Sequence, residues 1–163
     1  KMSGWVVAAM DALNYAGAVR FTPESDIPDL SGKVILVTGG GLNRISMIIN
    51  ATSNVMIPTG NAGLGKETVL QLAKHNPKKI FLAARSEVKA EEAIKSVKSS
   101  VSNDVEVVWI PLDLMSGKSI KNAAEQVNAQ SSRLDVLILN AGVMALPPGE
   151  TEMGHEIQLG TNH

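Results

Sequence analysis

Two groups of glycines lie where the chain could approach a phosphate group. Gly39 and Gly40 follow the first apolar, strand-like run, while Gly63 and Gly65 open a helical segment. Glycine lets a backbone approach a pyrophosphate closely, and the N-terminus of the following helix offers free N–H groups to an anion. Residues 41–60 separate the groups, and their removal would leave a strand, a T-G-x-x-x-G-x-G turn and a helix. The pattern predicts a dinucleotide-binding turn interrupted by a segment of 20 residues.

The second glycine group also matches part of another phosphate-binding loop. Residues 60–66 read G-x-x-x-x-G-K, and the apolar residues 55–57 could form a short strand before them. Glu67 then stands where a serine or threonine should hold magnesium, and its carboxylate would repel a triphosphate. A phosphate-loop NTPase therefore stays an alternative that we do not favour.

Polar residues also follow the three later strand-like runs. Arg85 ends the second run, Asp113 the third and Asn140 the fourth. The carboxyl ends of parallel strands share one edge of a sheet, where open α/β sheets bind ligands. An arginine after the second strand suits a 2′-phosphate, whereas NAD calls for an acidic residue, so NADP(H) is favoured over NAD(H). Taken singly, these residues also fit a surface arginine, a helix cap and a plain turn.

Strand-like and helix-like segments alternate along the chain and must position these residues. The patterns predict strands over 34–37, 80–84, 105–112 and 134–139, and helices over 67–75, 87–101 and 119–130. Buried strands that alternate with amphipathic helices indicate an α/β fold with a doubly wound, Rossmann-like parallel sheet. We expect an N-terminal lead-in over 1–30 and the N-terminal part of an NAD(P)-binding domain over 31–163, with 41–60 as an insert. The chain ends in a helical pattern, so we expect a sheet that is incomplete at its C-terminus.

Composition narrows the classes of function. The net charge is -1, aromatic residues make up 3% and cysteine is absent, which argues against nucleic-acid partners, disulfides and thiolate metal sites. The three histidines lack metal-ligand spacing, so no metal is expected. The apolar stretch 5–21 lacks a signal-peptide pattern and predicts an amphipathic helix, which leaves weak association with a membrane surface open. We expect a cytoplasmic protein and predict no oligomeric state.

Together these motifs resemble the short-chain dehydrogenase/reductase family, and most of all its classical, retinol-dehydrogenase-like branch. The similar stretches are DLSGKVILVTGG, NAGLGKETVLQLAKH, IFLAARS, PLDL, LDVLILNAGV and HEIQLGTNH, which cover most of 29–163 outside the insert. The resemblance implies an NADP(H)-dependent oxidoreductase that interconverts a small alcohol and a ketone or aldehyde. It implies cofactor contacts from Gly39, Gly40, Asn61, Gly63, Leu64, Gly65, Arg85, Asp113, Leu114, Asn140, Ala141 and Gly142.

The resemblance also implies which catalytic groups the chemistry requires. The family uses a serine and a Tyr-x-x-x-Lys pair, in which tyrosine is the general acid or base and lysine lowers its pKa. Tyr15 is the only tyrosine, and no Tyr-x-x-x-Lys occurs in the chain. Asn162 is similar to the family's asparagine that organises a proton-relay water, and it is the one catalytic residue implied. A non-catalytic nucleotide-binding module is therefore kept as an alternative.

Segment 41–60 has two interpretations. Closing a genuine loop of this length costs only about 2–3 kcal/mol by polymer scaling, so the fold could tolerate it. Alternatively, the segment is a retained intron translated in frame, which the codons at its two ends permit. It contains no acidic residue and one basic residue, unlike its surroundings. We favour the second interpretation, which a transcript carrying these codons in most copies would contradict.

Overall fold

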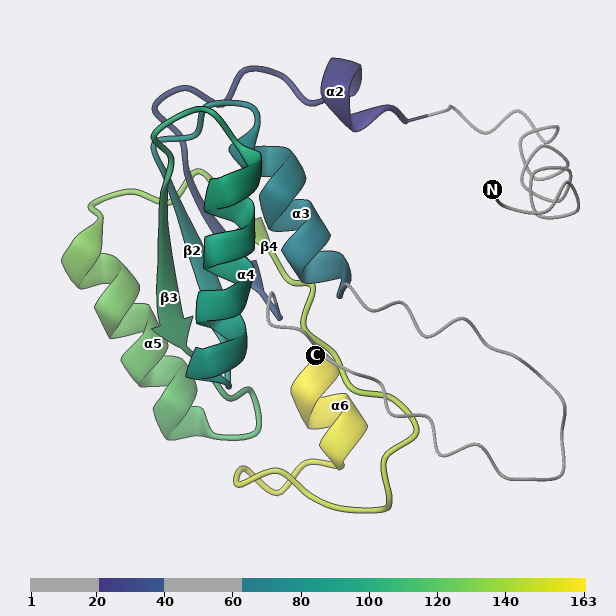
Figure 1. Ribbon diagram of the computed structural model, residues 1–163. Helices are drawn as coiled ribbons and strands as arrows, with labels where there is room; N and C mark the ends of the chain where they lie inside the picture. The colour runs from purple at the N-terminus through teal and green to yellow at the C-terminus, as the bar shows by residue number, and fades with distance from the viewer. Residues whose placement is uncertain (1–20, 40–62) are drawn as a thin grey trace, which may run out of the picture.

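A computed structural model describes residues 21–39 and 63–163 (Figure 1). The described chain forms one parallel sheet with helices on both faces, so the predicted α/β fold is confirmed. The lead-in helix expected over 5–21 lies outside these residues except for its last position. The segment 41–60 and the short strand considered at 55–57 lie outside them entirely.

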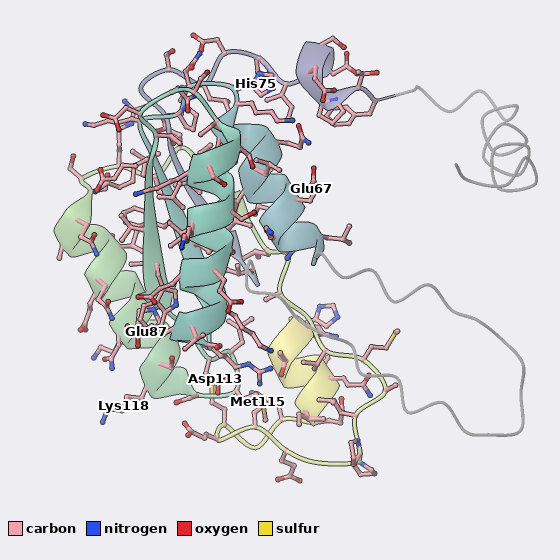
Figure 2. All side chains as sticks on the ribbon, viewed as in Figure 1. Glu67, His75, Glu87, Asp113, Met115 and Lys118 are labelled. Atoms are coloured by element: carbon pink, nitrogen blue, oxygen red, sulfur yellow. The ribbon has the colours of Figure 1, made fainter. Side chains whose placement is uncertain are left out.

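The sheet has four strands in the order β3-β2-β1-β4. Their bounds are Val34–Thr38 for β1, Lys79–Ala84 for β2, Glu106–Pro111 for β3 and Val136–Ile138 for β4. Ile35 pairs with Ile80 on one side and with Val136 on the other, and all three pairings are parallel. All four strands therefore end at the same edge. Figure 2 shows Asp113 near that end of the molecule and His75 at the opposite end.

Side chains that alternate along β2 divide the core into two layers. Ile80 and Leu82 face α3 (Leu64–Ala73) and α4 (Glu87–Ser100), whereas Phe81 and Ala83 face α5 (Gly117–Gln130). All four side chains are essentially buried, as expected of a central strand covered on both faces (Figure 1). The helices begin at serine caps where the sequence offers them, because the Oγ atoms of Ser86 and Ser116 accept bonds from backbone N–H groups three residues on.

Three elements differ from the sequence-based expectation. Helix α3 covers Leu64–Ala73 instead of 67–75, because it begins directly after Gly63. The segment 21–29 contains a one-turn helix, α2 (Pro23–Asp26), which starts at a proline. The Thr22 N–H donates to Asp26 Oδ2 at 2.6 Å.

Strand β4 is three residues long instead of six, and Leu137 is 52% exposed. β4 is an edge strand among those described, so it lacks the second neighbour that buries β1. The final helical pattern forms α6 (Ile157–Asn162), which lies beyond the carboxyl edge.

Candidate functional site

The turn after β1 requires glycine for two reasons. Gly39 has φ +75°, and its N–H donates to the Ala83 carbonyl oxygen at 2.8 Å. A Cβ atom at this position would lie 2.6 Å from the Ala141 Cα atom. The positive φ and the close approach of the backbone after β4 both exclude larger residues.

The second half of the turn meets the first in space. A Cβ atom at Gly65 would lie 2.6 Å from the Gly39 carbonyl oxygen and 2.5 Å from Asn140 Nδ2. Helix α3 therefore begins directly against the end of β1. Its first turn is regular, since the backbone N–H groups of Lys66 and Glu67 both donate to the Gly63 carbonyl oxygen.

Asn140 joins the ends of β1 and β4. Its Nδ2 donates to the carbonyl oxygens of Thr38 at 3.0 Å and Gly39 at 3.4 Å. The Ala141 N–H donates in turn to Thr38 Oγ1 at 3.0 Å, and Thr38 is 4% exposed. These bonds hold the end of β1 in place beside the start of α3.

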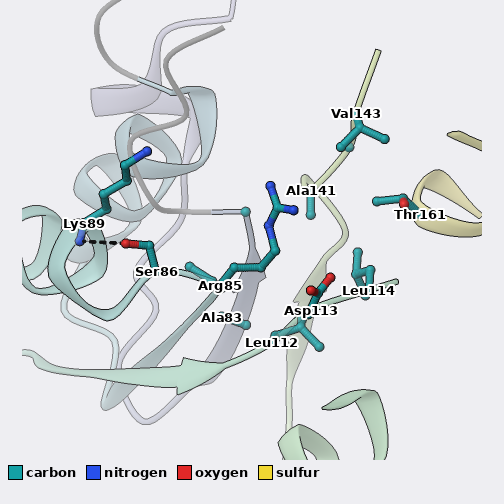
Figure 3. Close-up of a pocket in the computed structure, with 13 residues that line it drawn as sticks. Ala83, Arg85, Ser86, Lys89, Leu112, Asp113, Leu114, Ala141, Val143 and Thr161 are labelled. Atoms are coloured by element: carbon teal, nitrogen blue, oxygen red, sulfur yellow. Dashed lines mark hydrogen bonds between the residues drawn. The ribbon is translucent and has the colours of Figure 1, made fainter. Parts of the chain in front are cut away.

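A cavity of about 400 Å³ opens at this edge of the sheet (Figure 3). Six of the predicted cofactor-binding residues line it: Gly39, Arg85, Asp113, Leu114, Ala141 and Gly142. They come from the ends of all four strands, as the parallel topology predicts. Figure 3 shows Arg85 extending across the cavity between the start of α4 and the strand end that carries Ala141.

The cavity also contains residues that the sequence reasoning missed. Ser86 and Lys89 come from the start of α4, and Val143 and Thr161 come from the last part of the chain; Ala83, Ala84 and Leu112 complete the lining. The signal for the first pair was present, because a serine cap followed three residues later by lysine places both at the end of β2. Val143 directly follows the predicted Gly142 after β4, whereas no comparable local signal marked Thr161, which reaches the cavity through the placement of α6.

The charges at the mouth of the cavity suit an anion. Arg85 and Lys89 are exposed, and within residues 21–39 and 63–163 neither forms an ion pair. The Ser86 Oγ accepts from the Lys89 N–H at 3.4 Å, which fixes the first turn of α4 beneath them. Asp113 lies on the other side, where its Oδ1 accepts from the Met115 N–H at 3.0 Å and so stabilises the turn into α5.

Asn162 is fully engaged with the backbone beside the cavity. Its Oδ1 accepts from the Val143 N–H at 2.8 Å, and its Nδ2 donates to the Val143 carbonyl oxygen at 2.9 Å. The side chain thus positions residues 142–143 against α6, and its role toward a proton-relay water stays a prediction. The neighbouring Thr161 Oγ1 is buried and has no hydrogen-bond partner among the described residues.

The remaining predicted residues lie outside the cavity wall. Gly63 and Gly65 form the start of α3, and Leu64 between them is 80% exposed. Asn140 supports the turn from behind, while Gly40 and Asn61 are outside the described residues. In the described part of the chain, no group of His, Asp and Glu side chains could hold a metal ion. Nor is any of its helices both long and apolar enough to cross a membrane.

Comparison with known proteins decides the family. The sequence model of the short chain dehydrogenase family matches residues 53–159, about two thirds of the chain. The chain belongs to the short-chain dehydrogenase family. One relative, a short-chain dehydrogenase/reductase of Armillaria gallica, is 40% identical over 139 residues, which are 85% of this chain and 38% of the relative. Retinol dehydrogenase 13 of Homo sapiens is 38% identical over 145 residues, 86% of this chain and 43% of that protein. The chain thus spans about two fifths of the relatives' length.

Solved structures of the family show the same fold with either cofactor. A metagenomic short-chain oxidoreductase in complex with NADP is 25% identical with a TM-score of 0.53, over 71% of this chain and 41% of that one. An NAD⁺-bound xylitol dehydrogenase is also 25% identical, with a TM-score of 0.52 over 70% of this chain and 35% of that one. The fold is therefore common to NADP-binding and NAD-binding members of the family.

The family match begins inside segment 41–60, which contains a second strand-like run. Residues 54–60, NVMIPTG, are similar to residues 33–39, KVILVTG, and the family match includes all of the former and none of the latter. The structure assigns β1 to Val34–Thr38, between β2 and β4. Pro58 would take the place of Val37 in a central strand, where proline removes a ladder donor. Sheet chemistry thus favours the first run as β1.

Proposed function

We propose that the chain supplies the NADP(H)-binding part of an oxidoreductase that interconverts an alcohol and a ketone or aldehyde. The observation that carries this proposal is the cavity at the carboxyl edge, with a glycine turn on one side and two cationic side chains at its mouth. The alcohol or carbonyl substrate is a small molecule, consistent with the family to which the chain belongs.

The residues present fit a dinucleotide. The turn at Gly39 and the start of α3 would receive the pyrophosphate, since they combine close backbone approach with a helix N-terminus. Leu114 and Ala141 offer apolar surface for the adenine ring. The buried Thr161 Oγ1 needs a hydrogen-bond partner, which a ribose or amide group could provide. When bound, NADP(H) supplies the hydride chemistry, and this chain's own residues bind and orient it.

Arg85 and Lys89 support a preference for NADP(H). Both side chains belong to the lining of the cavity, where a 2′-phosphate would gain charge-assisted hydrogen bonds. Relatives with NADP and with NAD share the fold, so the preference rests on these two side chains.

Charge-removing variants test this preference. We expect Arg85→Ala and Lys89→Ala each to weaken NADPH binding roughly 10- to 100-fold, the effect of one lost charge-assisted bond, and to leave NADH binding unchanged. Calorimetric titration measures both affinities. Lys98→Ala, an equally exposed lysine in the last turn of α4, serves as the matched control and should change neither. Equal losses for NADPH and NADH would contradict the role in 2′-phosphate binding.

One observation favours a second function, binding without catalysis. The sequence contains no Tyr-x-x-x-Lys, so this chain alone offers no general acid for the carbonyl oxygen. We therefore expect it to bind NADPH without oxidising it when a panel of aldehydes and ketones is added. Absorbance of the reduced nicotinamide measures this directly. Turnover above the rate without protein would contradict the assignment and indicate another proton donor.

A further inference from the structure

The two ends of the undescribed stretch between Gly39 and Gly63 lie close together. Gly39 and Gly65 are 26 positions apart in sequence, yet a Cβ atom on Gly65 would lie 2.6 Å from the Gly39 carbonyl oxygen and 2.9 Å from its carbonyl carbon. The chain therefore leaves the turn and returns to it at nearly the same place.

Each end is anchored by contacts outside segment 41–60. On one side, Gly39 bonds to Ala83 of β2 and packs on Ala141. On the other, α3 is held on the sheet through Val69 and Ala73, which are 1% and 0% exposed. Asn140 lies between the two ends and contacts both. None of these contacts involves a residue of the segment.

Three residues are enough to connect the two ends. Gly63 precedes Gly65 by two positions, so the Gly39–Gly65 contact places Gly63 within about 12 Å of Gly39. Without residues 41–60, the connecting residues would be 40, 61 and 62. Their four Cα–Cα steps can span up to about 14 Å. The shortened connection requires no movement of β1 or α3.

We propose that residues 41–60 are dispensable for the nucleotide-binding turn, which the described contacts assemble across them. Deleting the segment leaves a continuous turn in the same place and a more stable protein. This inference concerns how the turn is assembled, and thermal stability tests it independently of any cofactor.

The primary test compares the wild-type chain with a variant that lacks residues 41–60. Reducing the connection from 23 residues to three lowers the entropy cost of closing it, and we expect the melting temperature to rise by about 5 °C. Circular dichroism follows the transition. An unchanged or lower melting temperature, or a deletion variant that does not fold, would overturn the proposal. If the deletion variant folds and the wild-type chain does not, that result would also support the proposal.

Two matched controls separate length from sequence. Replacing 41–60 by 20 residues of glycine and serine should keep the wild-type melting temperature, because the proposal assigns assembly of the turn to Gly39, Gly65 and Asn140, which lie outside the segment. Deleting 34–54 instead leaves Val55–Gly60 as the only first strand, with Pro58 in a central position. This variant should unfold at least 10 °C lower than the 41–60 deletion. Equal stability of the two deletions would show that either run can serve as β1, against the proposal.

A double-mutant cycle tests the contact itself. Gly65→Ala introduces the Cβ atom that would lie 2.6 Å from the Gly39 carbonyl oxygen, so it should lower the melting temperature. The decrease should be the same in the wild type and in the 41–60 deletion, because the contact is present in both. A decrease in the deletion alone would mean that the wild-type turn is not assembled. If the deletion is more stable but neither form binds NADPH, the assembly proposal stands and the proposed function fails.

Discussion

Asn140 shows how one side chain can maintain a binding site that it does not line. Its amide nitrogen bonds to the carbonyl oxygens of Thr38 and Gly39 and lies in the path of any side chain added at Gly65. The amide thus connects β4, the end of β1 and the start of α3. Buried or half-buried carbonyl groups that lose a donor are costly, so the bonds matter to stability as well as to geometry.

Replacing Asn140 should therefore destabilise the protein. We expect Asn140→Ala to lower the free energy of unfolding by about 1–3 kcal/mol, because two carbonyl oxygens lose their donor. Urea denaturation measures the change. Asn128→Ala, on the exposed face of α5, is the matched control and should stay within about 0.5 kcal/mol of the wild type. Similar losses in both variants would show that the Asn140 bonds are not stabilising.

The residues of the site were predictable to different degrees. Arg85 and Asp113 end strong apolar runs, so a parallel sheet places them at one edge on topology alone. Lys89 required the helix start at Ser86 to be recognised. Thr161 could not be found in this way, because the bonds of Asn162 to Val143, across 19 positions of sequence, bring α6 to the cavity.

At the level of helices and strands, the spacing of apolar residues predicted the longer helices, because their buried faces pack on the sheet. Helices α4 and α5 begin within two residues of the expected positions and end within one, since buried alanine and valine side chains recur at helical spacing. Strand β4 was overestimated because apolar character alone does not extend a strand that has one neighbour. Helix α2 was missed because a single turn carries no periodic signal, only a proline start and an acidic residue that bonds back.

Helix α6 has only six residues, too few to bury an apolar face, and its N-terminal cap stabilises it. The Glu156 carboxylate accepts from the backbone N–H groups of Gln158 at 3.0 Å and Leu159 at 2.8 Å. These backbone bonds hold the pKa of Glu156 below its usual range. Because the pKa is lowered by folding, the stabilisation is present above the unfolded pKa and is lost as the pH falls through the folded pKa.

The cap therefore predicts that the difference in melting temperature between the wild type and Glu156→Gln depends on pH. Glu156→Gln should melt below the wild type near pH 6.5, and the gap should narrow as the pH falls below about 4.5. Thermal melts at several pH values measure the gap. The lowered pKa values of Asp29 and Asp135 affect both proteins alike and cancel in the comparison. A gap that widens at low pH would contradict the assigned role.

At the level of the whole molecule, the described residues form a four-stranded parallel sheet with a cavity at its carboxyl edge, and the chain matches only part of its relatives' sequence. Four parallel strands, the glycine turn and the cavity are present, whereas the chain covers about two fifths of its relatives' length. Family membership is therefore better supported than any activity of this chain alone. The interrupted turn does not alter that conclusion, because Gly39 and Gly65 lie against each other although they are 26 positions apart in sequence.

We propose above all that this chain binds NADP(H) at the carboxyl edge of its sheet. Calorimetric titration of the unmodified chain with NADPH and then with NADH tests it most directly. We predict one NADPH site per chain, bound at least tenfold more tightly than NADH because Arg85 and Lys89 would contact the 2′-phosphate. Absence of NADPH binding by the folded chain, or equal affinity for both nucleotides, would contradict the account.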